Sequence, residues 1–217
     1  MISVYGLMYY ALEYAQESIN SIVGTAGEGL EINVIDSHSA RSAEIADWGH
    51  RAVNDGLITR FISADTNCKG AGPVWAYRNF PPSSDIIVVT DLDVIAKPGW
   101  LDELKFGLKT KELAGFGLEL DNYIEPNYGF TELHFGTWLM GMKVDLYERY
   151  LESQDHHLDS LVLQEAKWDY YKSEMPLKHL GWNTWRDYPA YWTEKLEHVD
   201  WRSSLPTIFS VYDGEGK

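Results

Sequence analysis

The chain has 217 residues, of which 45% are hydrophobic and 24% charged, and these values are close to those of an average soluble domain. Lys and Arg number 18 against 33 Asp and Glu, so the formal net charge is −15. Such a charge repels polyphosphate backbones and anionic lipid surfaces. We therefore expect one compact domain that binds no nucleic acid.

The first forty residues contain no Lys or Arg, and the whole chain contains one cysteine. No Lys or Arg precedes Arg41, so the charged opening of a signal peptide is missing, and the apolar runs are too short to cross a bilayer. The single cysteine, Cys68, rules out an internal disulfide and a cysteine-ligated zinc site. We expect a cytoplasmic protein without a transmembrane segment, in which oxygen or imidazole would hold any metal.

Strands and helices are predicted to alternate from the start of the chain. Apolar and β-branched runs predict strands at 2–10, 30–36, 57–63 and 85–90, and helical spacing predicts helices at 11–23, 45–53 and 73–79. Such alternation predicts an α/β fold, with a mainly parallel, doubly wound sheet flanked by helices. Ligands of such sheets bind at the carboxyl ends of the strands, so those ends matter most.

The pattern is less regular after residue 96. It predicts helices at 98–109, 144–152 and 158–172 and strands at 113–120 and 177–180. The segment from residue 183 onward is rich in aromatic residues and contains prolines, so we expect an irregular tail there.

Two carboxylates separated by one residue follow the apolar strand at 85–90. In an extended chain, Asp91 and Asp93 lie on the same side. Because two such carboxylates repel each other, a divalent cation or a ligand hydroxyl shared by both would stabilise them. Magnesium and manganese suit this role, since they prefer carboxylate oxygens and also bridge phosphates. The same pattern occurs in solvated turns, so the flanking residues decide its meaning.

Those flanking segments resemble one enzyme family. The Asp-x-Asp element at 91–93, followed by residues 97–104, is similar to the metal-binding signature of glycosyltransferases with the GT-A fold, particularly the family 2 group. Further matches occur in the same order along the chain, at 32–37, 67–72, 77–79, 136–138, 141–143 and 178–182. The resemblance implies a Rossmann-like GT-A fold and transfer of a sugar from a nucleoside diphosphate sugar, with uridine as the expected nucleoside, to an acceptor hydroxyl.

The resemblance also implies roles for the residues at the strand ends. Asp91, with Leu92 beside it, would contact the ribose or the donor sugar. Asp93 would ligate a manganese or magnesium ion that holds the diphosphate, and His179 would complete the coordination together with Asp91. The cation would neutralise the charge that grows as the nucleoside diphosphate leaves.

The base and the phosphates have their own expected contacts. Tyr5 and Gly6 of the first strand would form the base-binding wall with Asp36, whose counterpart in the family recognises the base. Lys69 and Arg78, which follow the third strand, would help on the phosphate side. Both cations also fit solvated surface positions.

The catalytic base is expected in the second half. Inverting family 2 enzymes use an Asp preceded by Glu at the start of a helix, and Asp155 best fits this base, with Asp159 second. The residue before Asp155 is Gln, which leaves the inverting and retaining outcomes open. Asp155 also fits a helix N-cap. The candidate acceptor-binding residues are Glu119, Asp121 and Trp138.

By this resemblance the chain divides into a nucleotide-sugar-binding half at 1–96, an acceptor-side half at 97–182 and the tail at 183–217. The acceptor region is short for this fold, so we expect it to be minimal or completed by a partner subunit, such as a second copy of the chain. Two alternatives stay open. Asp91 also fits the nucleophile of a haloacid-dehalogenase-like phosphotransferase, and the many tryptophans fit a non-catalytic carbohydrate-binding protein.

Overall fold

The computed structural model describes residues 1–68, 71–118, 139–153, 165–167, 169–180, 187–188 and 208–214. Within these ranges the strands are β1 (Ile2–Met8), β2 (Leu30–Asp36), β3 (Arg60–Ala64), β4 (Ile86–Asp91), β5 (Val94–Ile95), β6 (Leu113–Leu118), β7 (Met140–Lys143), β8 (Tyr171–His179) and β9 (Phe209–Tyr212). The helices are α1 (Leu12–Thr25), α2 (Ser42–Asn54), α3 (Ala71–Asn79), α4 (Trp100–Leu108) and α5 (Val144–Ser153). Strand and helix alternate as far as β4, as the sequence predicts.

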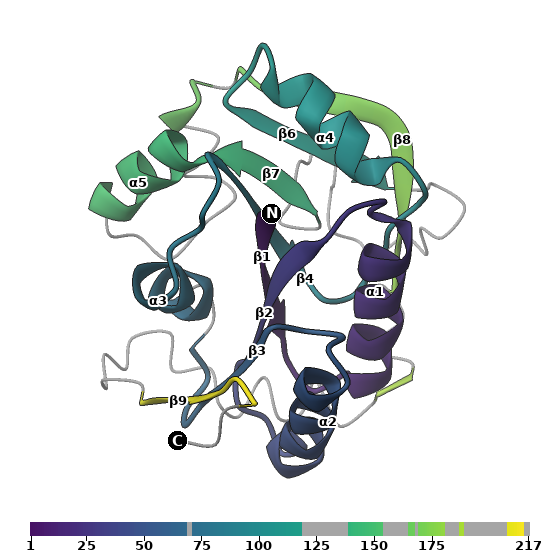
Figure 1. Cartoon of the computed structure of the whole chain (residues 1–217), viewed down its shortest axis with the longest axis vertical. Helices are drawn as coiled ribbons and strands as arrows, with labels where there is room; N and C mark the ends of the chain where they lie inside the picture. The colour runs from purple at the N-terminus through teal and green to yellow at the C-terminus, as the bar shows by residue number, and fades with distance from the viewer. Residues whose placement is uncertain are drawn as a thin grey trace.

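The described strands form one mixed sheet in the order β5-β8-β6-β7-β4-β1-β2-β3-β9. Its centre consists of the parallel neighbours β4, β1, β2 and β3, and β6 and β8 also pair in parallel. Antiparallel pairs join β7 to β4 and β6, β9 to β3, and β5 to β8. The predicted fold class is confirmed: a mainly parallel α/β sheet flanked by helices in one domain (Figure 1).

The strand order reverses next to β1. The chain builds β2 and β3 on one side of β1 and then returns to place β4 on the other side. In open α/β sheets, a ligand binds where the order reverses, in the crevice beyond the carboxyl ends of the strands. A ligand site is therefore expected at the carboxyl ends of β1, β2 and β4.

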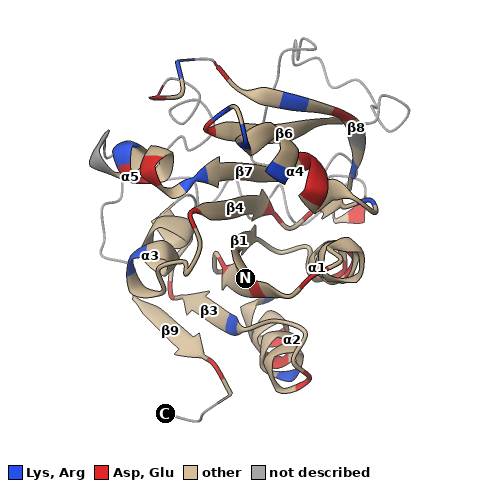
Figure 2. Ribbon diagram, turned by 45° about the horizontal axis from the view of Figure 1, so that its top comes forward, with Lys and Arg blue, Asp and Glu red and all other residues tan. Residues whose placement is uncertain are grey.

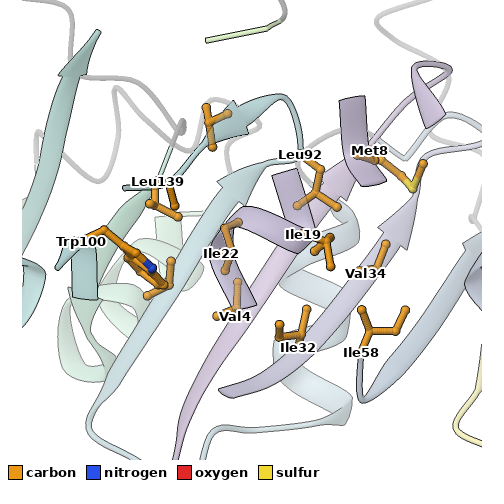
Figure 3. Close-up of a cluster of buried hydrophobic side chains, with 14 of the residues drawn as sticks. Val4, Met8, Ile19, Ile22, Ile32, Val34, Ile58, Leu92, Trp100 and Leu139 are labelled. Atoms are coloured by element: carbon orange, nitrogen blue, oxygen red, sulfur yellow. The ribbon is translucent and has the colours of Figure 1, made fainter. Parts of the chain in front are cut away.

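Helices cover both faces of the sheet. The helices α1, α2 and α4 lie on one face, whereas α3 and α5 lie on the other (Figure 1). Side chains alternate along a strand, so Val4 enters the first core and Tyr5 the second. Figure 3 shows the first core, where Leu92 packs close to Ile19 and Met8. This burial of apolar surface is the main favourable contribution to folding.

Charged side chains are distributed over the helices and the strand ends. Figure 2 shows acidic residues on α1, α2, α4 and α5, with basic residues beside them on α2, α4 and α5, while the strands are mostly free of charge. Among the described helices, none is both long and apolar enough to cross a membrane.

The largest error in the predicted secondary structure concerns β8. The sequence predicts a helix as far as residue 172 and a short strand at 177–180, but β8 begins at Tyr171 and runs to His179. Tyr171 pairs with Ala114 of β6, so a parallel partner is available at the point where the helix was predicted. A sheet that accepts another strand overrides the local helical periodicity.

The predicted irregular tail is wrong at its end. The segment Phe209–Tyr212 forms β9, which pairs antiparallel with β3. Phe209 also stacks on Trp75, with ring centroids 4.5 Å apart. The strands β5 and β7 were not predicted either. Elsewhere among the described residues, the predicted boundaries differ from the structure by no more than three residues, and the division into three segments stays a prediction.

Candidate functional site

The carboxyl ends of β1, β2 and β4 lie side by side. Met8 pairs with Asp36 on one side of β1, and Leu7 pairs with Asp91 on the other. The Ser37 N–H donates to the Met8 carbonyl oxygen at 2.9 Å, which continues the contact beyond the strand end. We call this end of the three strands the carboxyl edge. Neighbouring strands are about 4.8 Å apart, so the backbones of the two Asp residues are roughly 10 Å apart across β1.

Asp36 is fully buried at this edge. Neither carboxyl oxygen has a hydrogen-bond partner of ordinary geometry among the described residues. Burial raises the pKa of Asp36 to about 6, while the nearby Ser42 hydroxyl and His38 oppose part of this rise. Leaving a buried carboxyl without partners is costly, and a ligand N–H group that reaches it would offset the cost.

A short polar segment lies next to Asp36. The Ser37 hydroxyl donates to the Asn67 side-chain oxygen at 3.0 Å, and the Cys68 thiol is 3.5 Å from the same hydroxyl. Burial raises the pKa of Cys68 to about 11, so its thiol is protonated at neutral pH. Asn67 belongs to one of the segments that resemble the glycosyltransferase family, and the fold places it beside the end of β2.

Asp93 and His179 meet through an antiparallel pair that the sequence does not predict. Val94 of β5 pairs with His179 of β8, and the Leu180 N–H donates to the Asp93 carbonyl oxygen at 2.6 Å. As a result, His179 Nε2 is 3.2 Å from Asp93 Oδ2. The other oxygen of this carboxylate, Oδ1, is buried without a hydrogen-bond partner among the described residues.

The electrostatics of this pair differ from those of Asp36. Burial by itself would lower the pKa of His179, but the charge and hydrogen bond of Asp93, with a smaller effect of Asp91, raise it overall. The side chains of His179 and Asp93 are 12% and 28% exposed, so the pair lies near the surface of the fold. A partly buried carboxylate that already attracts a cationic group suits a cation.

The donor atoms at this pair fit a divalent cation only in part. Asp93 and His179 supply oxygen and nitrogen, and Asp91 is close enough to affect the pKa of His179. Within the part of the chain that the structure describes, no group of three or more His, Cys, Asp or Glu side chains gathers tightly enough to hold a metal. Magnesium is often held by one or two protein ligands, with phosphates and water completing the shell, so the pair fits that kind of site.

Gly6 and Leu92 lie close to the carboxyl edge, whereas Tyr5 lies inside the second core. Tyr5 is fully buried, and its hydroxyl donates to the Phe80 carbonyl oxygen at 2.6 Å. Leu92 is buried in the first core, and its N–H donates to the Leu7 carbonyl oxygen at 2.9 Å. A Cβ on Gly6 would lie 2.7 Å from a Leu92 methyl carbon, so glycine permits this close approach. Contact of these residues with a nucleotide stays a prediction.

Arg78 lies away from the start of its helix. It is exposed in the last turn of α3, roughly 10 Å along the helix axis from the first residue, Ala71. Its charge acts on the Tyr147 phenol of α5, so Arg78 lies on the face of the sheet that α3 and α5 cover. The structure thus does not group Arg78 with Asp36 and Asp93, and a phosphate contact stays a prediction.

Several predicted site residues lie outside the described residues. They are the candidate bases Asp155 and Asp159, the phosphate-side Lys69, and the acceptor-binding candidates Glu119, Asp121 and Trp138. Their roles stay predictions.

Sequence analysis also misses Arg41, whose contacts join three segments next to the carboxyl edge. The only signal that singles it out is its place as the first basic residue of an acidic chain.

The fold is similar to solved structures of Staphylococcus aureus TarS. The structure of TarS 1–349 aligns with a TM-score of 0.59 and 14% identity, and its complex with UDP aligns with 0.55 and 13%; each alignment covers 82% of this chain and 60% of the other. The chain thus spans about three fifths of TarS 1–349. The Streptococcus pneumoniae glycosyltransferase GlyE aligns less well, at a TM-score of 0.46 and 14% identity, over 80% of this chain and 45% of its own.

These likenesses establish the fold and nothing finer, because the identities are low. The sequence matches no protein-family model, and no curated protein matches it at a significant level. The residues at the carboxyl edge therefore carry the information about activity.

Proposed function

We propose that this protein transfers a sugar from a nucleoside diphosphate sugar to an acceptor hydroxyl, with the nucleotide bound at the carboxyl edge. The observation that carries the proposal is the placement of two unlike carboxylates on opposite sides of β1: Asp36, buried and without a partner of ordinary geometry among the described residues, and Asp93, which contacts His179. A nucleoside diphosphate has a neutral base with N–H groups at one end and a strongly anionic diphosphate at the other. The two carboxylates match these two ends.

Asp36 would receive the base. Neither of its buried oxygens has a hydrogen-bond partner of ordinary geometry among the described residues, so an N–H of uracil that reaches them would add a hydrogen bond. The TarS complex supports uridine, since a protein with a similar fold binds UDP. The register that places Asp36 beside Met8 would then orient the rest of the nucleotide across the end of β1.

Asp93 and His179 would hold a divalent cation, with Asp91 nearby. A manganese or magnesium ion bound there would neutralise the diphosphate and stabilise it as a leaving group. The chain has a formal net charge of −15, so its field opposes the approach of a diphosphate to a pair of carboxylates. Asp93 would orient the phosphates by fixing one ligand position, and His179 would set the direction of the Asp93 carboxylate through the 3.2 Å contact.

The acceptor hydroxyl needs a base to take its proton as the new bond to the sugar forms. Asp155 is our first candidate for this base and Asp159 the second.

Calorimetric titration with UDP, with and without manganese, tests the proposal. We expect manganese to tighten UDP binding to the wild type and to have no such effect on Asp93→Ala. Asp85→Ala is the matched control, because Asp85 is an exposed carboxylate just before the opposite end of the same strand. Equal UDP affinity with and without manganese in all three proteins would contradict the metal part, and absence of UDP binding would contradict the whole proposal.

A further inference from the structure

Arg41 binds three partners beside the carboxyl edge. Two of its nitrogens, Nη1 and Nη2, donate to the two carboxylate oxygens of Glu13 at 2.9 Å each, and Nε donates to Glu44 at 3.0 Å. The Nη1 atom also donates to the carbonyl oxygen of Tyr10 at 3.3 Å. The side chain is only 18% exposed. A planar guanidinium can make this set of bonds, whereas the single ammonium of Lys cannot.

Tyr10 occupies a strained turn. Its φ is 66°, and the Ala11 N–H donates back to the Tyr9 carbonyl oxygen at 2.7 Å, which closes a three-residue turn. A turn with positive φ at a tyrosine is rare and costs energy. Such a conformation persists only where the surroundings hold it. Arg41 holds it twice, through the Tyr10 carbonyl oxygen and through the ring, whose centroid is 5.8 Å from the guanidinium carbon.

A segment from far along the chain docks on the same group. The Tyr188 hydroxyl donates to Glu13 at 2.6 Å, and the Tyr188 ring centroid is 5.8 Å from the guanidinium carbon of Arg41. The ring also meets those of Tyr10 and Tyr14 edge to face, at 6.0 and 5.2 Å. Burial and the bond to Glu13 raise the pKa of Tyr188 far above neutral pH, so its hydroxyl stays a donor.

These contacts lie next to Asp36. Tyr10 comes two residues after Met8, which pairs with Asp36, and His38, two residues after Asp36, also has a positive φ of 53°. Two strained residues thus flank the buried carboxylate. Strain of this kind clusters at ligand sites, where the surrounding contacts keep the backbone in the binding conformation.

We propose that Arg41 is a positioning residue that holds the Tyr10 turn beside Asp36 and docks residues 187–188 on it, so that docking of this segment and binding of the nucleotide reinforce each other. The identity of the ligand rests on the proposed function, whereas the docking does not. A turn that is already ordered binds a ligand without first losing its own freedom, which is why the two events are coupled. Such coupling is reciprocal, so nucleotide must stabilise the docked segment as much as the segment favours nucleotide.

Amide hydrogen exchange and UDP titration test both halves on the full chain. Arg41→Lys keeps the positive charge but loses the paired guanidinium hydrogen bonds to Glu13. Tyr188→Phe keeps the aromatic ring but loses the hydroxyl hydrogen bond to Glu13. For Arg41→Lys we expect faster exchange in the peptides that contain Tyr10 and Tyr188 and about tenfold weaker UDP binding. Tyr188→Phe should show the same changes to a smaller degree. In the wild type, UDP should slow exchange at Tyr188.

The control is Arg149→Lys. Arg149 belongs to α5, on the other face of the sheet, and its two guanidinium Nη atoms donate to the two carboxylate oxygens of Glu112. This substitution should change neither exchange near Tyr188 nor UDP affinity. Unchanged exchange at Tyr188 in Arg41→Lys would overturn the docking, and faster exchange with unchanged UDP affinity would overturn the coupling. If the wild type binds no UDP while exchange still responds to Arg41→Lys, the proposed function and the coupling fail and the docking is upheld.

Discussion

Asp36 and Asp93 lie on opposite sides of the end of β1, and their surroundings differ in kind. Asp36 is fully buried, neither of its carboxyl oxygens has a hydrogen-bond partner of ordinary geometry among the described residues, and burial raises its pKa to about 6. Asp93 is partly exposed and contacts His179, whose pKa it raises. In our proposal, the buried carboxyl of Asp36 receives a neutral N–H donor, whereas Asp93 receives a cation. The environment of each carboxylate, more than its residue type, sets the difference between them.

Removing the ionisable group of Asp36 should change the pH dependence of the unfolding free energy. As pH rises from about 4 to 6, the unfolded chain releases the Asp36 proton while the folded chain keeps it, so the wild type loses stability across this window. A rise of the pKa from 3.8 to about 6 corresponds to roughly 3 kcal/mol. The unfolding free energy of Asp36→Asn minus that of the wild type should therefore increase by about 2–3 kcal/mol between pH 4 and pH 7.

Urea unfolding at several pH values measures this difference. Asp85→Asn, at an exposed position, should show a constant difference from the wild type over the same range. A constant difference for Asp36→Asn as well would mean that Asp36 is not held in its neutral form by burial.

Uridine and UDP should distinguish the proposed roles of Asp36 and Asp93. Uridine carries the base without the diphosphate, so Asp93→Ala should bind uridine as the wild type does and lose the gain in affinity that UDP shows with manganese, a loss of about 10- to 100-fold. Asp36→Ala should weaken uridine and UDP by the same factor. Calorimetry with both ligands on both variants checks this. Equal losses of uridine affinity in the two variants would contradict the separate roles proposed for Asp36 and Asp93.

The strands of the fold differ in how far the sequence predicts them. β2 was predicted with its exact ends, because a run of seven apolar and polar residues between turn signals suffices to identify it. β9 and β5 have few residues and are strands only because β3 and β8 pair with them. The Tyr171 segment was predicted as helix for the same reason: its strand depends on β6, far away in the chain.

The site shows the same limit. Parallel strand order alone predicts that Asp36 and Asp91 share an edge, and the register confirms it. The contact between Asp93 and His179 needs the antiparallel pair of β5 and β8, which no local pattern in the sequence indicates. Arg41 was missed because its partners, Glu13, Tyr10 and Tyr188, share no spacing that a motif would capture.

A third prediction tests how the two sides are held apart. A Cβ at Gly6 would push on Leu92, which lies between Asp91 and Asp93, so Gly6→Ala should destabilise the fold by roughly 1–3 kcal/mol. Gly24→Ala is the matched control: nothing lies within 4 Å of its Cβ, and alanine in a helix should stabilise the chain slightly. Urea unfolding measures both. Equal stability of Gly6→Ala and the wild type would show that the Leu92 side chain yields to the added methyl group without cost.

The smallest effect concerns Cys68, which shares the closed surroundings of Asp36. Burial raises the pKa of the Cys68 thiol first, and the charge of Asp36 adds to this rise. At pH 8 Asp36 is ionised, so Asp36→Asn should lower the thiol pKa and speed its reaction with a disulfide reagent by about threefold. At pH 5 the wild-type carboxyl is mostly protonated, and the variant and the wild type should react at the same rate. A rate ratio that is the same at both pH values would mean that the variant acts on Cys68 through packing, because only a charge that appears between pH 5 and pH 8 makes the ratio depend on pH.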